Sequence, residues 1–336
     1  MLRRGLRSPW FSFSRPPQCS GSHRGLAGGD MPAVKVFDRA VKRRQRDRAA
    51  SLDLGGEYEY LREHVANSLV DRLEDISRGF PYALDVGAHT GQIYRAVCAK
   101  RGPNGKGGVG GIERLVQADM SEQALLQGMY YGRSGGEQGD VKVETCRVLA
   151  DEEFLPFKPG SFDLVLSNLS LHWVNDLPGS MSQVKQVLKP DGAFIGSMLG
   201  GTTLTELRRC LLAAEQEREG GQSVHTSPSA HVADCGNLLL SAGFSLPTVD
   251  QDTIRISYPN AFVLMEHLQV MGEGNASLNR RIGVSRDTFI AAAAAYQEIY
   301  GEPDGTVEAT FQVVYMIGWS PHESQPTPKR RGSGQA

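Results

Sequence analysis

Short apolar runs alternate with segments of helical spacing through the middle of the chain. The runs that predict strands are residues 82–86, 115–119, 143–149, 162–168 and 192–198. The segments that predict helices are residues 91–100, 121–131, 177–188 and 203–217. Because strands that alternate with helices favour a parallel sheet covered on both faces, we expect an α/β, doubly wound, Rossmann-like core.

The two flanks of this core add further elements. Residues 36–50 combine many basic residues with good helix formers, and residues 57–73 carry apolar residues at helical spacing. After the core, the pattern predicts a strand, two helices and a last strand, at residues 248–257, 260–271, 285–300 and 310–318. The chain thus predicts a mostly parallel, seven-stranded sheet with a helical insertion before its last strand.

These patterns divide the chain into six parts. They are a transit peptide (1–30), an N-terminal helical segment (31–80), a Rossmann-like domain (81–257), a helical cap insertion (258–309), the last strand of the sheet (310–320) and a disordered tail (321–336). The tail is assigned by its proline and basic residues.

The first 29 residues carry five arginines, several serines and no acidic residue. Aromatic residues such as Trp10 and Phe13 are interleaved, and a continuous apolar stretch is missing. This composition favours a mitochondrial transit peptide over a secretory signal, the alternative being a disordered amino terminus.

Charge and cysteine content exclude several classes of protein. The formal net charge is -2, so with its basic leader removed the chain is acidic and has no basic footprint for nucleic acid. The five cysteines form no CxxC pair, which argues against a disulfide framework and a zinc site. One basic cluster remains, at Lys42 to Arg48. It predicts either docking on an acidic partner or anionic lipid, or a solvated helix face.

A glycine-bearing turn follows the first strand of the core, in the run Tyr82-Ala-Leu-Asp-Val-Gly-Ala-His-Thr-Gly91. Gly87 and Gly91 stand where the backbone must turn tightly and approach a ligand at the amino end of a helix. Acidic residues then follow in order, at Asp119 after the second strand and at Asp151 before the fourth. This order predicts an adenosine-containing cofactor, S-adenosylmethionine (AdoMet), at the carboxyl edge of the sheet.

Each acidic residue has a predicted role and an alternative. Asp85, near Gly87, is placed at the amino acid end of the cofactor, or else it caps a helix. Asp119 offers two acceptor oxygens to the ribose hydroxyls, unless it is a helix N-cap, a role that Ser121 also fits. Asp151 is placed at the adenine amino group, whereas the neighbouring Glu152 and Glu153 are expected in solvent.

The fourth strand carries the candidate catalytic residues. Asn168, at its end, is predicted to face the reactive methyl group or the substrate, and His172 is a candidate general base. The apolar neighbours of His172 favour packing equally, and Trp173 is either a wall of the substrate cleft or simply packed. The sequence lacks a nucleophile elbow, a Walker loop, an HExxH helix and iron-site spacing, so no metal is expected.

Several motifs together resemble the class I AdoMet-dependent methyltransferases. They are Asp85-x-Gly, Ala118-Asp-x-Ser, Asp151-Glu-Glu-Phe-Leu-Pro-Phe157, Phe162-Asp-Leu-Val and Leu188-Lys-Pro-Asp-Gly192. Within that superfamily, Phe37-Asp-Arg39, Ser170-Leu-His-Trp-Val-Asn-Asp-Leu-Pro178 and Met265-Glu-His-Leu-Gln-x-Met-Gly272 resemble the mitochondrial complex I assembly factor 5 family. The resemblance covers residues 34 to 323.

The resemblance implies an arginine hydroxylase with a methyltransferase fold. It leaves open whether the enzyme also transfers a methyl group. It implies an iron-sulfur subunit of complex I as the partner, acting early in assembly, peripherally on the matrix side of the inner membrane. Two alternatives stand beside it. One is an AdoMet-dependent methyltransferase of a small molecule or acyl carrier, and the other is a non-catalytic assembly chaperone. The chaperone is favoured by His89, which replaces the middle glycine of the family's Gly-Cys-Gly-x-Gly loop.

Overall fold

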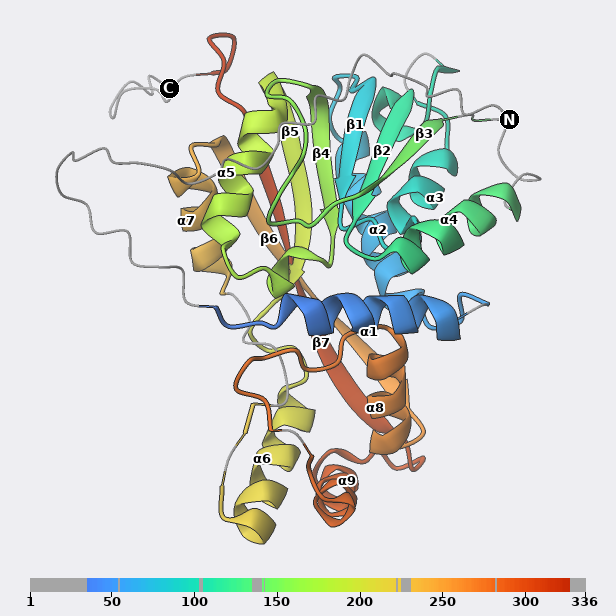
Figure 1. The fold of residues 1–336 in the computed structure, drawn as a ribbon, viewed down its shortest axis with the longest axis vertical. Helices are drawn as coiled ribbons and strands as arrows, with labels where there is room; N and C mark the ends of the chain where they lie inside the picture. Colours follow the sequence, from blue (N-terminus) through green and yellow to red (C-terminus); the bar gives the residue numbers. More distant parts are fainter. Residues whose placement is uncertain are drawn as a thin grey trace, which may run out of the picture.

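A single seven-stranded sheet forms the centre of the computed structural model, which describes residues 35–326 except 54, 103–104, 135–140, 142, 222, 225–230 and 282 (Figure 1). The strand order is β3-β2-β1-β4-β5-β7-β6. The strands are β1 (Tyr82–Val86), β2 (Arg114–Asp119), β3 (Glu144–Leu149), β4 (Phe162–Asn168), β5 (Leu188–Leu199), β6 (Ser245–Tyr258) and β7 (Val307–Trp319). Strands β1 to β5 pair in parallel, whereas β7 is antiparallel to both β5 and β6. The predicted fold class is confirmed.

Helices cover both faces of the sheet because successive residues of its strands point to opposite sides. On one face, α2 (Tyr60–Glu74) and α3 (Gln92–Cys98) share a core cluster with Ala83 of β1. On the other face, α5 (Leu177–Val187) and α7 (Val232–Ser241) pack with Leu84, the next residue of the same strand. The predicted doubly wound arrangement is therefore present.

Three helices form a lobe beyond the carboxyl edge of the sheet: α6 (Thr205–Glu219), α8 (Ala261–Val270) and α9 (Arg286–Tyr300) (Figure 1). The apolar face of α6 packs on α9, through residues such as Leu211 and Ala292 in one cluster. The sequence analysis placed residues 203–217 in the Rossmann-like domain. Helix α6 instead lies with the cap helices, because it packs on α9.

Helix α1 (Arg39–Leu52) runs across the carboxyl edge, between the sheet and this lobe (Figure 1). Asp38 caps its amino end by accepting a hydrogen bond from the backbone N–H of Val41, 3.0 Å away. The helix contacts α4 (Glu122–Ser134) on the sheet side and α8 on the lobe side. It thus covers the edge at which the sequence analysis places the functional site.

Several element bounds differ from expectation; for example, β6 and β7 begin at Ser245 and Val307 rather than at residues 248 and 310. Strand β5 begins at Leu188 rather than residue 192, and Asp191 takes the left-handed conformation with φ 62°. Residues 321–326, predicted as disordered tail, are held in place because the amide of Gln325 donates to the Asp191 carboxylate at 2.9 Å. The predicted transit peptide (1–30) and residues 327–336 lie outside the described residues.

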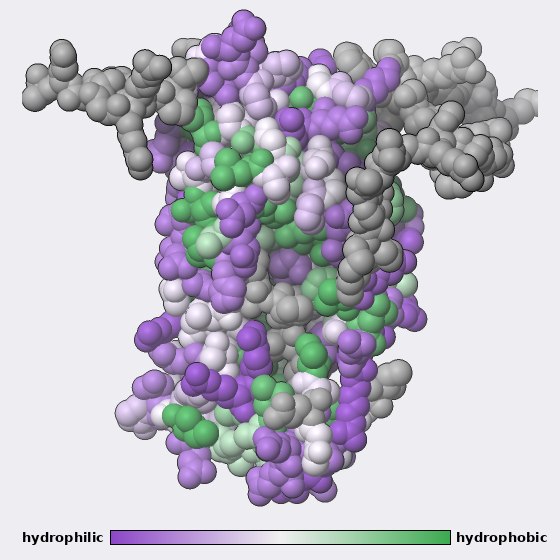
Figure 2. All heavy atoms as spheres, turned by 90° about the vertical axis from the view of Figure 1, so that its left-hand side faces the viewer, coloured by the Kyte–Doolittle hydropathy of each residue, from purple (hydrophilic) through white to green (hydrophobic). Residues whose placement is uncertain are grey.

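Figure 2 shows the side of the molecule that carries α5 and α7, where hydrophobic residues are interspersed with polar ones over the sheet half. Leu240 of α7 is one exposed example, at 57%. Isolated exposed apolar residues are ordinary on a protein surface. Within the described part of the chain, every helix is too short or too polar to cross a bilayer.

Candidate functional site

The turn between β1 and α3 has the geometry that its glycines allow. Gly87 and Gly91 have φ of +73° and +87°, in the left-handed region that glycine occupies at little cost. The N–H of Gly87 donates to the Ala118 carbonyl at 2.8 Å, which fixes the turn against β2. A Cβ atom on Gly87 would lie 2.1 Å from the Ser170 hydroxyl oxygen, so only glycine fits there. Both predicted glycine positions thus belong to the tight turn.

His89 occupies the centre of this turn in a strained conformation. Its φ of 48° lies in the left-handed region, which costs a residue with a Cβ roughly 1–2 kcal/mol. Its side chain is buried, and Nε2 has no hydrogen-bond partner among the described residues. Burial, followed by the nearby charges of Arg62 and Arg46, lowers the pKa of His89 far below its usual range. The imidazole is therefore neutral.

Asp119 lies at the end of β2, as predicted, and its carboxylate is fully buried. One oxygen accepts the N–H of Ser121 at 2.7 Å, and the other accepts the N–H of His89 at 3.0 Å. The same second oxygen lies 3.4 Å from the Arg46 guanidinium. Ser121 is the helix cap, because its hydroxyl oxygen accepts the N–H of Ala124 at 3.1 Å. The Asp119 carboxylate therefore binds the turn after β1 and Arg46 of α1.

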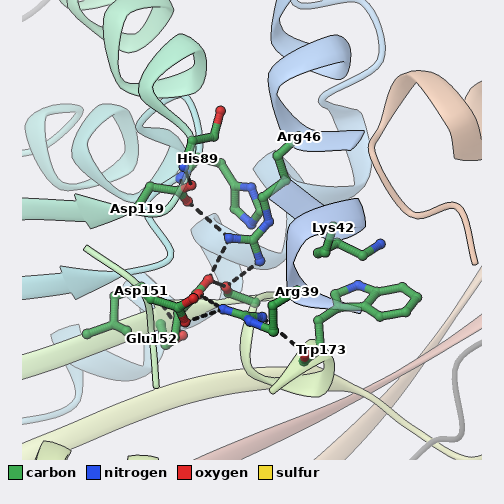
Figure 3. Close-up of polar contacts among 12 residues, drawn as sticks. Arg39, Lys42, Arg46, His89, Asp119, Asp151, Glu152 and Trp173 are labelled. Carbon is green, nitrogen blue, oxygen red and sulfur yellow. Dashed lines mark hydrogen bonds and ion pairs between the residues drawn. The ribbon is translucent and has the colours of Figure 1, made fainter. Parts of the chain in front are cut away.

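Glu152 is an acidic residue whose position was predicted wrongly. It is 1% exposed, although it was expected in solvent. Its carboxylate pairs with Arg39 and, at 2.5 Å, with Arg46, and it accepts the Ser170 hydroxyl at 2.5 Å (Figure 3). Burial raises the pKa of Glu152, but Arg46 and Arg39 outweigh burial and lower it overall. The reason for the error is that two guanidinium groups from α1 accompany this carboxylate into the interior.

The neighbours of Glu152 are likewise held by protein groups. The Asp151 carboxylate accepts Arg39 at 2.6 Å, and Arg39 also donates to the Trp173 carbonyl at 3.1 Å. The Glu153 carboxylate accepts the N–H of Asn175 at 2.7 Å, so it is not solvated as expected. Figure 3 shows Arg39 reaching from α1 to Asp151 and Glu152, and Arg46 reaching from the same helix to Glu152 and Asp119.

Helix α1 turns one face of the basic cluster inward. Arg39, Lys42 and Arg46 follow one another at helical spacing, and Lys42 and Arg46 are at most 3% exposed. Arg43, by contrast, lies on the exposed face. The two readings of the cluster, a docking surface or a solvated face, are therefore wrong for Lys42 and Arg46. The sequence did contain the signal, namely basic residues three and four positions apart.

Lys42 fixes the loop that follows α8. Its ammonium group donates to the carbonyls of Gly272 and Gly274, both at 2.9 Å, and lies 3.2 Å from the centre of the Trp173 indole ring. Burial lowers the pKa of Lys42 well below its usual range. Because Glu273 stands between the two bonded glycines, Lys42 determines where that carboxylate lies.

The Glu273 carboxylate contacts three side chains, a grouping that the sequence pattern did not predict. One oxygen lies 2.6 Å from Arg62, while the other lies 2.8 Å from the Trp173 indole N–H and 3.2 Å from Nε2 of His172. Burial opposes its ionisation, but His172, Arg62 and Lys42 together lower the pKa of Glu273 well below its usual range. Burial also lowers the pKa of His172, despite the neighbouring carboxylate.

Asn168 and Asp85 lie beside this network. Asn168 is buried, its amide donates to the Arg62 carbonyl at 2.9 Å and its oxygen accepts the Ser197 hydroxyl at 3.3 Å. Asp85 is 1% exposed, and neither carboxylate oxygen has a hydrogen-bond partner among the described residues. Burial and then the charge of Asp119 raise the pKa of Asp85 well above its usual range.

Two cavities flank these residues. The first has a volume of about 30 Å³ and is lined by Arg46, Arg62, His89 and residues around them. The second, of about 210 Å³, lies towards the lobe and carries His172, Trp173 and Glu273 in its wall. In the part of the chain that the structure describes, no three His, Cys, Asp or Glu side chains gather as a metal site.

Comparison with known proteins places this site in a family. Residues 84–196 match the sequence model described as a methyltransferase domain. The arginine-hydroxylase NDUFAF5, mitochondrial, of Danio rerio is 47% identical over 98% of this chain and 92% of its own length. The chain belongs to this arginine-hydroxylase family. The human member is 46% identical over 99% of this chain and 92% of its own length. The resemblance found in the sequence is thereby confirmed.

Other similar proteins carry the methyltransferase fold without the hydroxylase name. The malonyl-[acyl-carrier protein] O-methyltransferase of Halorhodospira halophila is 32% identical over 85% of this chain and 89% of its own length. Among solved structures, phosphoethanolamine N-methyltransferase 2 of Haemonchus contortus in complex with S-adenosylhomocysteine has a TM-score of 0.50. Its identity is 13% over 84% of this chain and 60% of that one, so it establishes the fold alone. The family thus joins a hydroxylase name to a methyltransferase-type fold.

Proposed function

We propose that this protein hydroxylates an arginine side chain on an iron-sulfur subunit of mitochondrial complex I, early in assembly. The observation that carries the proposal is the identity of 40–47% to mitochondrial arginine hydroxylases over 90–99% of the chain. The geometry supports it, because the sheet edge already binds guanidinium groups. The buried Asp119 and Glu152, and Glu273 with 10% of its side chain exposed, each contact an arginine of this chain.

The site of action follows from the same relatives, whose names carry the word mitochondrial. We place the protein on the matrix side of the inner membrane as a peripheral protein. The transit-peptide composition of residues 1–30 supports import into mitochondria. Contact with the membrane is part of this proposal.

AdoMet is the cofactor that we propose for the carboxyl edge of the sheet, beside the smaller cavity. Asp119 would bind the ribose hydroxyls, Asp85 and Gly87 would face the amino acid end, and Asp151 would face the adenine. The buried carboxylate of Asp85, which has no hydrogen-bond partner among the described residues, fits a polar ligand group. When bound, AdoMet supplies an activated methyl group. Hydroxylation by dioxygen further needs two electrons and two protons, and it releases one water.

The present conformation leaves little room for that cofactor. Sites for small molecules have volumes of roughly 300–1,000 Å³. The smaller cavity has about 30 Å³, because Arg46 and His89 line it and Arg46 approaches Asp119. The acidic residues fit AdoMet, but the space beside them is too small. Arg46 of α1 must therefore move away before the cofactor enters.

A second candidate function is methyl transfer to an acyl-carrier substrate. The walls of the larger cavity are mostly apolar, which suits an acyl chain, and Arg208 in its lining suits a carboxylate. A third candidate is an assembly chaperone without turnover, which the buried, strained His89 favours.

The experiment that tests the proposal combines binding and chemistry. Isothermal titration with AdoMet compares residues 31–336 of the wild type with the His89→Gly and Asp119→Ala variants. Loss of the ribose hydrogen bonds in Asp119→Ala is expected to weaken binding by about 1–3 kcal/mol. An arginine peptide incubated with the protein, isotopically labelled dioxygen and a two-electron donor is then expected to gain one labelled oxygen.

Each outcome separates the candidates. Transfer of a methyl group to a malonyl thioester, with no oxygen added to arginine, would select the acyl-carrier function. Neither AdoMet binding nor any product would select the chaperone. Binding that appears only after His89→Gly would show that the turn closes the cofactor site in this chain.

A further inference from the structure

The two cavities share one wall, and an ion pair forms it. Arg62, from α2, lines the smaller cavity, while Glu273, from the loop after α8, lines the larger one. The two side chains meet at 2.6 Å, and each is 10% exposed. Any passage between the two cavities along this line therefore requires this pair to open.

Arg62 is held more weakly than the other inward-facing arginines. Arg46 contacts Asp119, Glu152 and Ser170, whereas the hydrogen bonds of the Arg62 guanidinium run to Glu273 alone in the described part of the chain. Nε of Arg62 is buried without a hydrogen-bond partner there. Of these two guanidinium groups, that of Arg62 thus loses fewer bonds when it moves.

Glu273, in contrast, is fixed from several sides. Lys42 holds the two flanking carbonyls, and Trp173 and His172 donate to the oxygen that Arg62 does not contact. A carboxylate accepts about four hydrogen bonds. The Glu273 carboxylate therefore keeps its position when Arg62 leaves, and it presents its other oxygen to a new donor.

The larger cavity has the size and character that an arginine side chain needs. Its volume is about 210 Å³. For comparison, a cavity of about 150 Å³ lined by apolar residues binds benzene, whose roughly six non-hydrogen atoms equal those of arginine beyond Cβ. Leu204, Leu207 and Phe311 offer apolar walls for the methylene stem, and Glu273 is the single carboxylate in the described lining. Gln269, also in the lining, is exposed, so the cavity reaches the surface there.

We propose that Glu273 binds the guanidinium group of the substrate arginine, and that Arg62 occupies this carboxylate until the substrate displaces it. Exchange of one guanidinium for another keeps the Glu273 carboxylate paired before and after the exchange, which avoids the large penalty for leaving this carboxylate unpaired. Arg62 then turns towards the smaller cavity, which it already lines. The arginine identity of the ligand rests on the function proposed above, while the exchange rests on this geometry.

The test measures binding, using the full chain and α-N-acetylarginine methylamide as the probe. Its citrulline counterpart, which has the same shape without the charge, reports the contribution of charge. Arg62→Met removes the competitor and is expected to tighten arginine binding about fivefold or more, a gain that misfolding does not produce. Glu273→Gln keeps the shape of the side chain and is expected to weaken arginine binding about tenfold or more. Citrulline binding should change little in either variant.

A matched control removes another arginine-carboxylate pair. Asp250→Asn breaks the Arg72–Asp250 pair. The charged groups of this pair lie 2.8 Å apart, but the Asp250 side chain is 62% exposed. It is expected to leave the affinity for the probe unchanged. The proposal is overturned if folded Glu273→Gln binds the probe as tightly as the wild type, or if Arg62→Met binds it no more tightly.

The oxygen-incorporation assay separates this proposal from the proposed function. Labelled oxygen on an arginine peptide, together with unchanged binding by Glu273→Gln, would place the arginine elsewhere and leave the hydroxylase standing. Probe binding that follows the expected order, without oxygen incorporation, would support the arginine site and overturn the hydroxylase. Absence of both would overturn both proposals.

Discussion

The two cavities on either side of the Arg62–Glu273 pair differ in what fills them. The smaller one is lined by charged and polar side chains, Arg46, Arg62 and His89 among them, and it holds about 30 Å³. The larger one is mostly apolar, carries one fixed carboxylate and holds about 210 Å³. The side proposed for the cofactor is thus closed by α1, whereas the side proposed for the substrate is open. The comparison indicates that α1 determines whether the smaller cavity is open, whereas it affects the larger cavity only by fixing the position of the Glu273 carboxylate.

The strongest way to break the closed side is to remove its central carboxylate. Glu152→Gln would leave the buried guanidinium groups of Arg39 and Arg46 without their shared partner, and the loss of one member of a buried pair costs about 3–5 kcal/mol. Urea denaturation should show this decrease in the free energy of unfolding. Glu144→Gln is the control, because its pair with Arg114 is exposed, and it should change stability by less than about 1 kcal/mol. Equal effects of the two variants would contradict the buried network.

The position of the open side's carboxylate depends on Lys42. Lys42→Met keeps the length of the side chain but removes two hydrogen bonds, to the carbonyls of Gly272 and Gly274, and leaves those buried acceptors with fewer donors. We expect a loss of about 2 kcal/mol in the free energy of unfolding.

Hydrogen exchange distinguishes this local effect from a general one. In Lys42→Met, the amides of residues 272–277 should exchange faster than the decrease in the free energy of unfolding explains. The amides of β1 and β4 should exchange faster only by the amount that this decrease explains. Arg43→Met, on the exposed face of the same helix, should alter neither quantity. Slower or unchanged exchange in the loop of Lys42→Met would show that α1 does not position Glu273.

The sequence predicted the frame of the site better than its contents. Asp119 and Asp151 follow strands, and the carboxyl ends of parallel strands meet at one edge, so their neighbourhood was predictable from the alternating pattern. Arg46 and Glu273 come from a helix before the sheet and a loop after it. Their approach to the edge depends on how α1 and the lobe dock, which no local periodicity specifies. Glu152 was predicted in solvent for the same reason, since its partners lie more than a hundred positions away.

The smaller cavity can be opened by replacing Arg46, whose side chain closes it. Arg46→Met removes the guanidinium that contacts Asp119, while Arg39 still pairs with Glu152. Isothermal titration should give AdoMet binding about tenfold tighter than in the wild type, which is about 1.4 kcal/mol. Arg43→Met serves again as the control and should not change the affinity. Weaker binding in Arg46→Met would mean that Arg46 holds the cofactor rather than excluding it.

Asp85 gives the smallest effect and the sharpest pH signature, because its carboxylate is buried without a hydrogen-bond partner among the described residues. Burial and then Asp119 raise the pKa of Asp85, so the folded state binds this proton more tightly than the unfolded state. The wild type therefore loses stability as pH rises above about 4, the value for an unfolded aspartate, until the pH passes the folded-state pKa. The asparagine in Asp85→Asn does not titrate. At pH 8 the free energy of unfolding of this variant should therefore be about 1 kcal/mol higher than that of the wild type, and the difference should shrink towards pH 4. Asp71→Asn, whose side chain is 68% exposed in the wild type, should show no such gain. A gain for Asp85→Asn that grows towards acid pH would instead mean that the carboxylate is ionised in the fold.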